Sequence, residues 1–155
     1  MRETPPDRPT LHLLARAVIF VEGQVLLARA GGARHTFLPG GHLEAGESLP
    51  VTLERQLLEE TGQRCVVQGY LGAVEHALEE GGRRHFEVNH LFVAALPDLD
   101  DPHDLHSADQ HLQFIFAAPD ALELLRLEPR PVIGWIQKLA RGETPPTWAS
   151  SLEAR

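Results

Sequence analysis

The glycine pair Gly81-Gly82 separates two segments, 70–78 and 83–95, whose residues favour β-strands. A Gly-Gly pair between two such segments is a strong signal for a β-hairpin with a two-residue turn. The length of the turn fixes which residues face each other across the hairpin, and it places Glu87 opposite His76. The chain is therefore expected to build its sheet around one long hairpin of defined register.

This register sorts the side chains of the hairpin onto two faces, because neighbouring residues of a strand point to opposite sides. The polar face of an antiparallel hairpin is often the side that meets water, and a binding surface is the alternative. Glu75 and Glu87 lie on opposite faces, so the two cannot serve one site without a β-bulge. The polar face carries His76, His85, Glu87 and Asn89, and the more apolar face carries Ala73, Glu75, Ala77, Phe86, Val88, His90 and Phe92.

The rest of the chain predicts an α/β fold. Strand-like segments are expected at 11–21, 24–29, 36–38 and 111–117, and helical patterns at 49–61, 119–127 and 131–141. Trp135 lies at helical spacing among apolar neighbours, so we expect it in the core. Residues 1–9, with three prolines, are expected to be a disordered N-terminal tail, residues 10–142 one domain, and residues 143–155 a C-terminal tail or an arm for a partner subunit.

Composition limits the classes of function. The chain has 155 residues, enough for one domain with a sizeable core. Its formal net charge of −8 argues against a surface that follows long nucleic acids. The single cysteine, Cys65, lies in an apolar segment, which favours a buried thiol and a cytoplasmic compartment. Neither the N-terminus nor segment 11–21 reads as a signal peptide or a membrane span, so no membrane association is expected.

The segment 38–46, called the glycine loop, precedes the helix predicted at 49–61. The ends of this helix are marked by the capping residues Ser48 and Gly62. Adjacent carboxylates on one helical face repel each other unless a positive charge offsets them. Mg²⁺ is such a charge, because it prefers oxygen ligands and is held by one or two carboxylates plus substrate phosphates. The segment therefore predicts a metal–phosphate site, and a solvated helix face is the alternative. The residues that share this face are Gln56, Glu59 and Glu60.

The stretch from Gly41 to Gln63 resembles the Nudix box. That pattern is glycine, five residues, glutamate, seven residues, and then Arg-Glu-apolar-any-Glu-Glu-any-Gly-apolar. Two positions depart from it, since Gln56 replaces a glutamate and Gln63 replaces an apolar residue. The resemblance covers about residues 11–142 and implies a Nudix-like α/β/α sandwich with a mixed β-sheet. The matching positions are Gly41, Glu47, Arg55, Leu57, Glu59, Glu60 and Gly62.

The resemblance also implies an activity, namely hydrolysis of a nucleoside diphosphate linked to another group. Water would attack phosphorus with the help of a divalent metal, Mg²⁺ or Mn²⁺. By position, Glu59, Glu60 and the carbonyl of Gly40 would hold the metal, while Glu47 and Arg55 would form a pair that ties the loop to the helix. The expected partner is a small phosphorylated substrate, a nucleotide, and a homodimer is in keeping with similar proteins.

Gln56 stands where the family usually has a glutamate that binds metal or acts as the general base. A glutamine keeps the shape and can offer a carbonyl oxygen, but it cannot accept a proton near neutral pH. Glu87 is the candidate for the missing carboxylate. The candidate substrate contacts beside it are His76, His85 and Asn89, and a second set of candidate carboxylates is Asp98, Asp100 and Asp101.

Two functions therefore remain open. The chain is either an active hydrolase with a reduced rate or a catalytically impaired Nudix-fold module that binds nucleotides or regulates. The retained carboxylates favour the first, and Gln56 favours the second. A structural zinc site is disfavoured, because no cysteine joins the loop histidines whose spacing a zinc ion could use, His103, His106 and His111.

Overall fold

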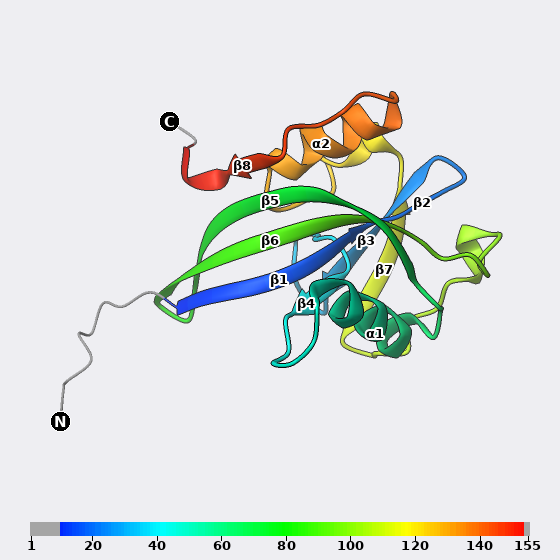
Figure 1. The fold of residues 1–155 in the computed structure, drawn as a ribbon, viewed down its shortest axis with the longest axis horizontal. Coiled ribbons are helices and arrows are strands. Elements are labelled where there is room, and N and C mark those ends of the chain that lie inside the picture. The colour runs from blue at the N-terminus through cyan, green and yellow to red at the C-terminus, as the bar shows by residue number, and fades with distance from the viewer. Residues whose placement is uncertain (1–9, 154–155) are drawn as a thin grey trace.

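The computed structural model describes residues 10–153. This part of the chain forms strands, two α-helices and three short 3-10 helices (Figure 1). In chain order the elements are β1 (Thr10–Val18), β2 (Phe20–Val21), β3 (Gln24–Ala30), β4 (Gly40–His42), α1 (Leu49–Thr61), β5 (Val66–Glu80), β6 (Arg83–Ala95), η1 (Pro102–Asp104), β7 (Leu112–Ala117), η2 (Pro119–Ala121), α2 (Pro131–Ala140), β8 (Trp148–Ser150) and η3 (Ser151–Glu153).

The strands form two sheets. The larger has the order β4-β1-β6-β5-β8, and it is mixed because β1 runs parallel to β6 and β8 parallel to β5. The smaller sheet, β2-β3-β7, is antiparallel. Helices α1 and α2 lie on opposite sides of the larger sheet (Figure 1). The predicted mixed α/β sandwich is confirmed.

The predicted hairpin is confirmed together with its register. Gly81 and Gly82 form the turn with φ angles of 60° and 75°, a conformation that glycine adopts without steric cost. His76 pairs with Glu87 across β5 and β6. Irregular pairing appears only toward the start of β5, between Val67 and Gly69 and between Tyr70 and Gly72, so the register near Glu87 is undisturbed.

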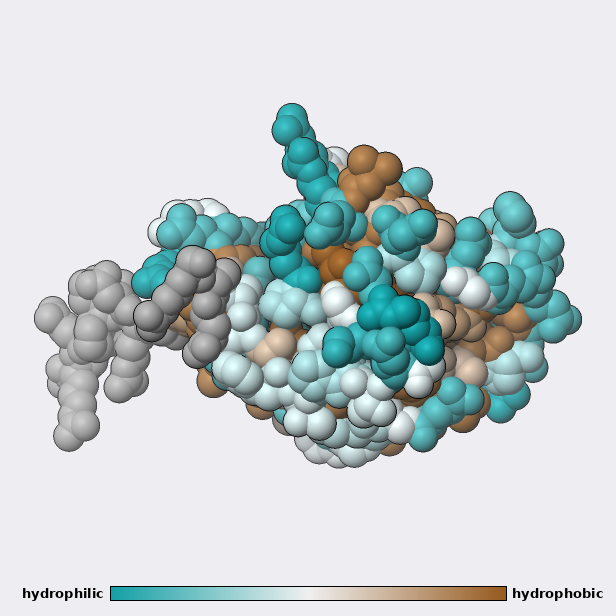
Figure 2. Space-filling model, turned by 90° about the horizontal axis from the view of Figure 1, so that it is seen from above, coloured by the Kyte–Doolittle hydropathy of each residue, from teal (hydrophilic) through white to brown (hydrophobic). Residues whose placement is uncertain are grey.

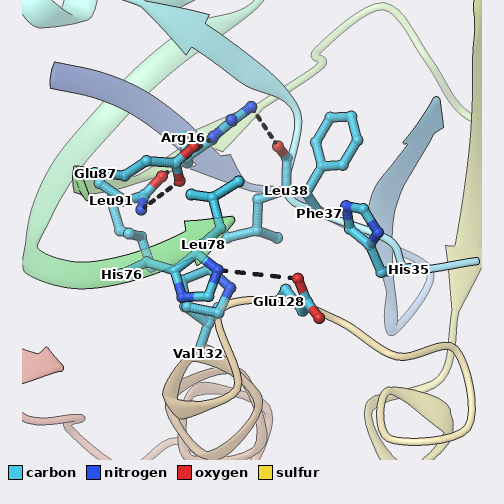
Figure 3. A pocket seen from close by; sticks show the side chains of 12 residues that line it. Arg16, His35, Phe37, Leu38, His76, Leu78, Glu87, Leu91, Glu128 and Val132 are labelled. Carbon is cyan, nitrogen blue, oxygen red and sulfur yellow. Dashed lines mark hydrogen bonds and ion pairs between the residues drawn. The ribbon is translucent and has the colours of Figure 1, made fainter. Parts of the chain in front are cut away.

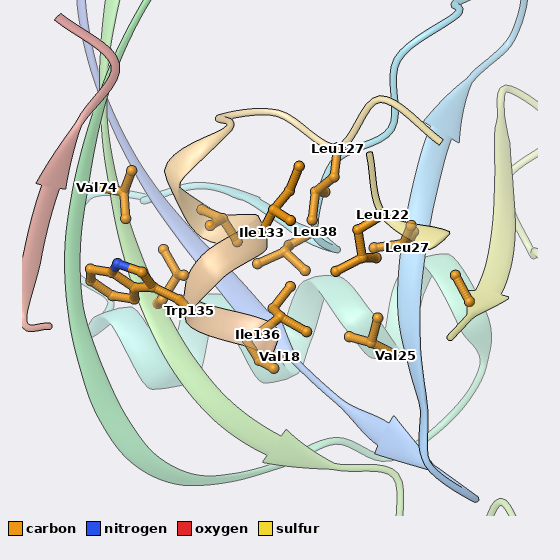
Figure 4. Close-up of a cluster of buried hydrophobic side chains, with 13 residues drawn as sticks. Val18, Val25, Leu27, Leu38, Val74, Leu122, Leu127, Ile133, Trp135 and Ile136 are labelled. Carbon is orange, nitrogen blue, oxygen red and sulfur yellow. The ribbon is translucent and has the colours of Figure 1, made fainter. Parts of the chain in front are cut away.

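Two apolar clusters hold the layers together. Helix α2 contributes Trp135, which is only 3% exposed and packs with Val74 of β5 in the first cluster (Figure 4). Helix α1 buries Leu53 and Leu57 in the second, on the other side of the sheet. Trp135 and the free thiol Cys65 are both buried, as predicted.

Two strand predictions need correction. The segment 11–21 is not one strand, because the chain leaves the larger sheet at the fully buried Ile19 and continues as β2 in the smaller sheet. The segment 36–38 makes only isolated bridges, from Phe37 to Ala28 and from Thr36 to Leu127. The neighbouring strand in this region is β4, three residues long.

The helix predicted at 119–127 is wrong, since only the short η2 forms there. The chain leaves the helical path at Arg126, whose φ is 52°, and the backbone N–H of Leu127 donates to the carbonyl of Leu122. Thr36 holds this turn, because its hydroxyl donates to the carbonyl of Leu125 and its backbone N–H to that of Arg126. Leu122 and Leu127 are fully buried, whereas Leu124 is exposed, which is an irregular rather than a helical pattern.

The C-terminal segment also differs from the prediction. Residues 148–150 form β8, which extends the larger sheet, so the ordered domain continues beyond residue 142. The predicted N-terminal tail, residues 1–9, lies outside the described residues. None of the helices within residues 10–153 is long and apolar enough to cross a membrane. Seen from the α2 side, the surface has apolar patches interrupted by polar side chains (Figure 2).

Candidate active site

Helix α1 forms as its sequence predicts, from Leu49 to Thr61. Ser48 accepts a hydrogen bond from the backbone N–H of Val51 at its start, and Gly62 ends it with a φ of 70°. The helix packs on the sheet through its buried leucine stripe. Of its polar side chains, Arg55 and Gln56 bond to Glu47 and His42 of the segment that precedes the helix.

Glu47 and Arg55 form the predicted pair between the glycine loop and the helix. Arg55 Nη2 lies 3.0 Å from Glu47 Oε1, and Arg55 Nε lies 3.0 Å from Glu47 Oε2. Thr52 adds a hydroxyl donor to the same carboxylate at 3.1 Å. These hydrogen bonds hold the pKa of Glu47 below its ordinary value, chiefly through Arg55. Arg55 also contacts Glu59 at 3.3 Å, and so it orients one of the two box carboxylates.

Glu60 is the more enclosed of those two carboxylates. Its pKa is raised from 4.5 to about 7, chiefly by burial; Arg16 opposes the shift, and Asp109 and Glu59 add to it. The backbone carbonyl of Glu60 accepts a hydrogen bond from Ala108 at 2.7 Å, which fastens the 97–111 loop to the end of α1. Asp109 was not among the candidate carboxylates of this loop, which were Asp98, Asp100 and Asp101.

Gln56 is tied to the glycine loop. Its side-chain amide donates to the backbone carbonyl of His42 at 3.1 Å. Gly41 leaves the space for this side chain, because a Cβ at position 41 would collide with Gln56 Oε1. Gly40 is equally restricted, with a φ of 136° and no room for a Cβ against the carbonyl oxygen of Ala15. The backbone therefore needs glycine at position 40, whereas a Cβ at position 41 would displace the Gln56 side chain.

A pocket of about 180 Å³ opens on the polar face of the hairpin. Glu87 and Asn89 of β6 and His76 of β5 line it, so this face is a concave surface rather than a plain solvated one (Figure 3). The volume is below the roughly 300 Å³ at which pockets for whole ligands begin, and it suits a single ring system. The lining residues are Arg16, His35, Phe37, Leu38, His76, Leu78, Glu87, Asn89, Leu91, Glu128, Pro129 and Val132.

Arg16 of β1 connects this pocket to the box helix. Its Nη1 donates to the carbonyl of Leu38 at 3.1 Å, and its guanidinium stacks over the ring of Phe37 at 5.2 Å. Burial lowers the pKa of Arg16, whereas the negative charges of Glu87 and Glu60 raise it. One cation thus interacts with the carboxylate of the pocket and with that of the helix.

Asn89 is 1% exposed and acts mainly as a brace inside the pocket. Its amide donates to the carbonyl of Val74 at 3.3 Å and to Glu87 Oε2 at 3.4 Å. Its side-chain oxygen accepts from Arg16 Nε at 3.4 Å. Because these bonds use both ends of the amide, Asn89 orients Glu87 and Arg16.

Other predicted site residues lie elsewhere. His85 shares the polar face but does not line the pocket, and its Nδ1 lies 3.1 Å from Nε2 of His12. Asp98 pairs with Arg64, and Asp101 caps η1, so their carboxylates serve local structure. Asp100 lines no part of the pocket. His103, His106 and His111 do not form a metal-binding group in the described part of the chain.

Sequence reasoning missed Arg16 and Glu128. Arg16 sits in a strand between Ala15 and Ala17, which are buried under α1, and alternation alone turns its side chain to the other face. That alternation was available in the sequence, but the pairing of β1 with β6 was not. Glu128 reaches the pocket from an irregular segment and had no sequence signal.

Comparison with known proteins agrees with this geometry. A family model described as NUDIX domain matches residues 10–136. A Mycobacterium tuberculosis protein named "Putative mutator protein MutT4" is 37% identical over 73 residues, which is 46% of this chain and 29% of that relative. The chain therefore spans less than a third of the length of that relative.

Solved structures share the fold. A NUDIX hydrolase from Nitrosomonas europaea has a TM-score of 0.68 and 23% identity, with 90% of this chain and 93% of that chain covered. The MutT protein from Methanosarcina mazei has a TM-score of 0.64 and 22% identity, with 86% and 96% covered. Because the family model matches most of the sequence, including the whole box and the hairpin, the chain belongs to the NUDIX domain family.

Proposed function

We propose that this Nudix pyrophosphohydrolase cleaves the diphosphate linkage of a small molecule joined to a nucleoside diphosphate, with help from a divalent cation. The observation that carries the proposal is a chain of hydrogen bonds around Arg16, which donates to the carbonyl of Leu38 in the glycine loop and to Asn89, the partner of Glu87. Gln56 of α1 bonds to the same loop at His42, and this supports treating the box helix and the pocket as one site. A diphosphate bound between them would meet a cationic side chain, and its nucleoside would have a pocket beside it.

The box residues suit a hard cation. Glu60 is held beside two further carboxylates, Glu59 and Asp109, in a setting that raises its pKa to about 7. A divalent cation would relieve this repulsion. In the described residues no group of three or more acidic, histidine or cysteine side chains is arranged to hold a metal ion alone. The cation would therefore be held by one or two carboxylates together with substrate phosphates, as is common for Mg²⁺.

Glu59, Glu60 and the carbonyl of Gly40 are the residues we assign to hold Mg²⁺ or Mn²⁺. Such an ion supplies charge neutralisation for the diphosphate and lowers the pKa of bound water. Glu47 and Arg55 then act by keeping the glycine loop against the helix. Asp109 is a further acidic residue available on the loop side of Glu60.

Glu87 is the residue we assign to accept the proton of the attacking water. It lines the pocket, and it is oriented by Asn89 on the side facing Arg16. A carboxylate can accept a proton near neutral pH, whereas the amide of Gln56 cannot. The nucleoside, rather than a nucleic-acid polymer, is the expected partner of a pocket of this size.

The second candidate is a Nudix-fold module that binds nucleotides without turning them over. One observation favours it, namely that Gln56 has a structural bond to His42 at the position where the family usually has a catalytic glutamate. The carboxylates Glu59 and Glu60 favour hydrolysis, because a binding module has little need of them.

A substrate panel distinguishes the two. The chain would be incubated with Mg²⁺ or Mn²⁺ and nucleoside triphosphates, dinucleoside polyphosphates, nucleotide sugars or ADP-ribose, and the released phosphates would be followed by chromatography. Hydrolysis that stops when the cation is chelated supports the proposal. Cation-dependent binding without hydrolysis of any panel member would favour the binding module.

A further inference from the structure

The C-terminal segment contacts His76, which lines the pocket, through Ser151. Ser151 Oγ lies 2.9 Å from Nδ1 of His76, a residue 75 positions away in the sequence. The same oxygen accepts a hydrogen bond from the backbone N–H of Ala77 at 3.2 Å. Strand β8, which pairs with β5 just before this point, sets Ser151 in place.

These contacts are compatible with Ser151 holding one tautomer of the His76 ring. The Ser151 oxygen accepts from Ala77 and carries a single proton, which it can donate to His76 Nδ1. With Nδ1 as acceptor, a neutral ring carries its proton on Nε2. Burial lowers the pKa of His76, while Glu87 and Glu128 oppose the shift, and burial therefore favours the neutral ring.

The Nε2 side of His76 lies next to Glu128. Nε2 and Glu128 Oε2 are 3.9 Å apart, which is too long for a hydrogen bond. Figure 3 marks this pair with a dashed line, but 3.9 Å is an ion-pair distance, and with a neutral ring the N–H of His76 and the carboxylate of Glu128 make no hydrogen bond to each other. Phe37 and Val132 are among the apolar residues that line the same pocket.

We propose that Ser151 is a positioning residue that holds His76 as a hydrogen-bond donor to a ring carbonyl of the substrate, while Glu128 accepts from the neighbouring ring N–H. This role of Ser151 rests on the proposed function, because the ring is taken to be the base of the nucleoside. Glu128 Oε2 lies 3.9 Å from His76 Nε2, so its negative charge disfavours a phosphate group at this end of the pocket. A ring that carries a carbonyl beside an N–H matches the N–H of His76 and the carboxylate of Glu128.

The first test reads the tautomer directly. Nitrogen-15 NMR spectra of the whole chain would distinguish a proton on Nδ1 from one on Nε2 of His76. The expected result is Nε2–H in the wild type and in Ser151→Thr, and a mixture of both forms in Ser151→Ala. The control is Ser150→Ala, because Ser150 bonds to Leu152 rather than to His76. A wild-type ring protonated on Nδ1, or a tautomer unaffected by Ser151→Ala, would overturn the positioning role.

The second test measures the binding of two nucleosides and requires no hydrolysis. Inosine has a ring carbonyl beside an N–H, and nebularine is the same nucleoside lacking both groups. We expect inosine to bind at least about tenfold more tightly. That preference should fall in Ser151→Ala and persist in Ser151→Thr and Ser150→Ala.

Equal affinity for the two nucleosides, or no binding of either, would refute the proposed ligand class. A preference that Ser151→Ala leaves unchanged would refute the role of Ser151. Neither nucleoside has a diphosphate, and no cation is needed. These outcomes are therefore independent of whether the chain hydrolyses anything.

Discussion

The side-chain amide of Gln56 donates a hydrogen bond to the backbone carbonyl of His42 at 3.1 Å. A glutamate at this position could not make that bond while ionised, because a carboxylate only accepts. The residue that breaks the box pattern is thus integrated into the glycine loop. Gln56 belongs to the architecture of the site, and the proton acceptor is to be sought in the pocket.

Gln56→Glu should destabilise the chain when divalent cations are chelated. The substitution removes the donor to His42 and places a carboxylate beside its carbonyl oxygen. We expect the free energy of unfolding to fall by about 1–3 kcal/mol, measured by urea denaturation. Mg²⁺ should restore part of the loss. An equal loss in the control Gln110→Glu, at an exposed position, would contradict this account of Gln56.

Glu60 should make stability depend on pH in the absence of divalent cations. Its folded pKa of about 7 exceeds the ordinary 4.5, so the folded chain holds this proton more tightly than the unfolded chain. The resulting stabilisation is fully present below about pH 4.5 and is lost as the pH rises through about 7. Allowing for partial solvation, we expect about 1–2 kcal/mol.

The measurement compares the wild type with Glu60→Gln across this range in a chelating buffer. The difference in unfolding free energy between the two should change in favour of the variant as the pH rises. A constant difference would show that Glu60 titrates at its ordinary pKa.

Gly40→Ala should be much more destabilising than Gly46→Ala. Both glycines have positive φ, of 136° and 85°, but only the Cβ at position 40 would collide with the Ala15 carbonyl. We expect about 1 kcal/mol for Gly46→Ala and about 3 kcal/mol or more for Gly40→Ala in chemical denaturation. Similar losses at the two positions would mean that the loop moves away from β1 at little cost.

Glu87→Gln should reduce kcat on a substrate found in the panel by about a hundredfold or more, because the amide cannot accept the proton. Glu75→Gln is the control, since Glu75 lies on the opposite face and bonds to Trp148. Circular dichroism would verify that both variants fold. Wild-type turnover in Glu87→Gln would remove Glu87 from the mechanism.

Local signals in the sequence predicted the elements that form locally. The glycine turn set the hairpin register, and the capping residues set the ends of α1, so Glu87 and His76 were placed opposite each other. The box spacing likewise brought Glu47 to Arg55. Each of these relationships depends on residues close in sequence or on one turn of known length.

Long-range pairing limited the rest of the prediction. Arg16 enters the site because β1 runs parallel to β6, and Ser151 because β8 runs parallel to β5. Parallel strands are not joined by a short turn, so no turn residues in the sequence indicate which strands pair. The segment 119–127 was predicted as a helix, but it turns at Arg126, with a φ of 52°, and this turn is held by hydrogen bonds from Thr36, far away in the chain.

The most direct test of the central claim compares hydrolysis by the wild type and by Glu60→Gln in Mg²⁺, with Glu80→Gln at the exposed hairpin tip as control. We predict cation-dependent cleavage of a diphosphate-linked nucleotide by the wild type and the control. Glu60→Gln should lose at least about a hundredfold in turnover while staying folded. Turnover that survives Glu60→Gln or chelation, or binding without turnover in the wild type, would contradict the claim.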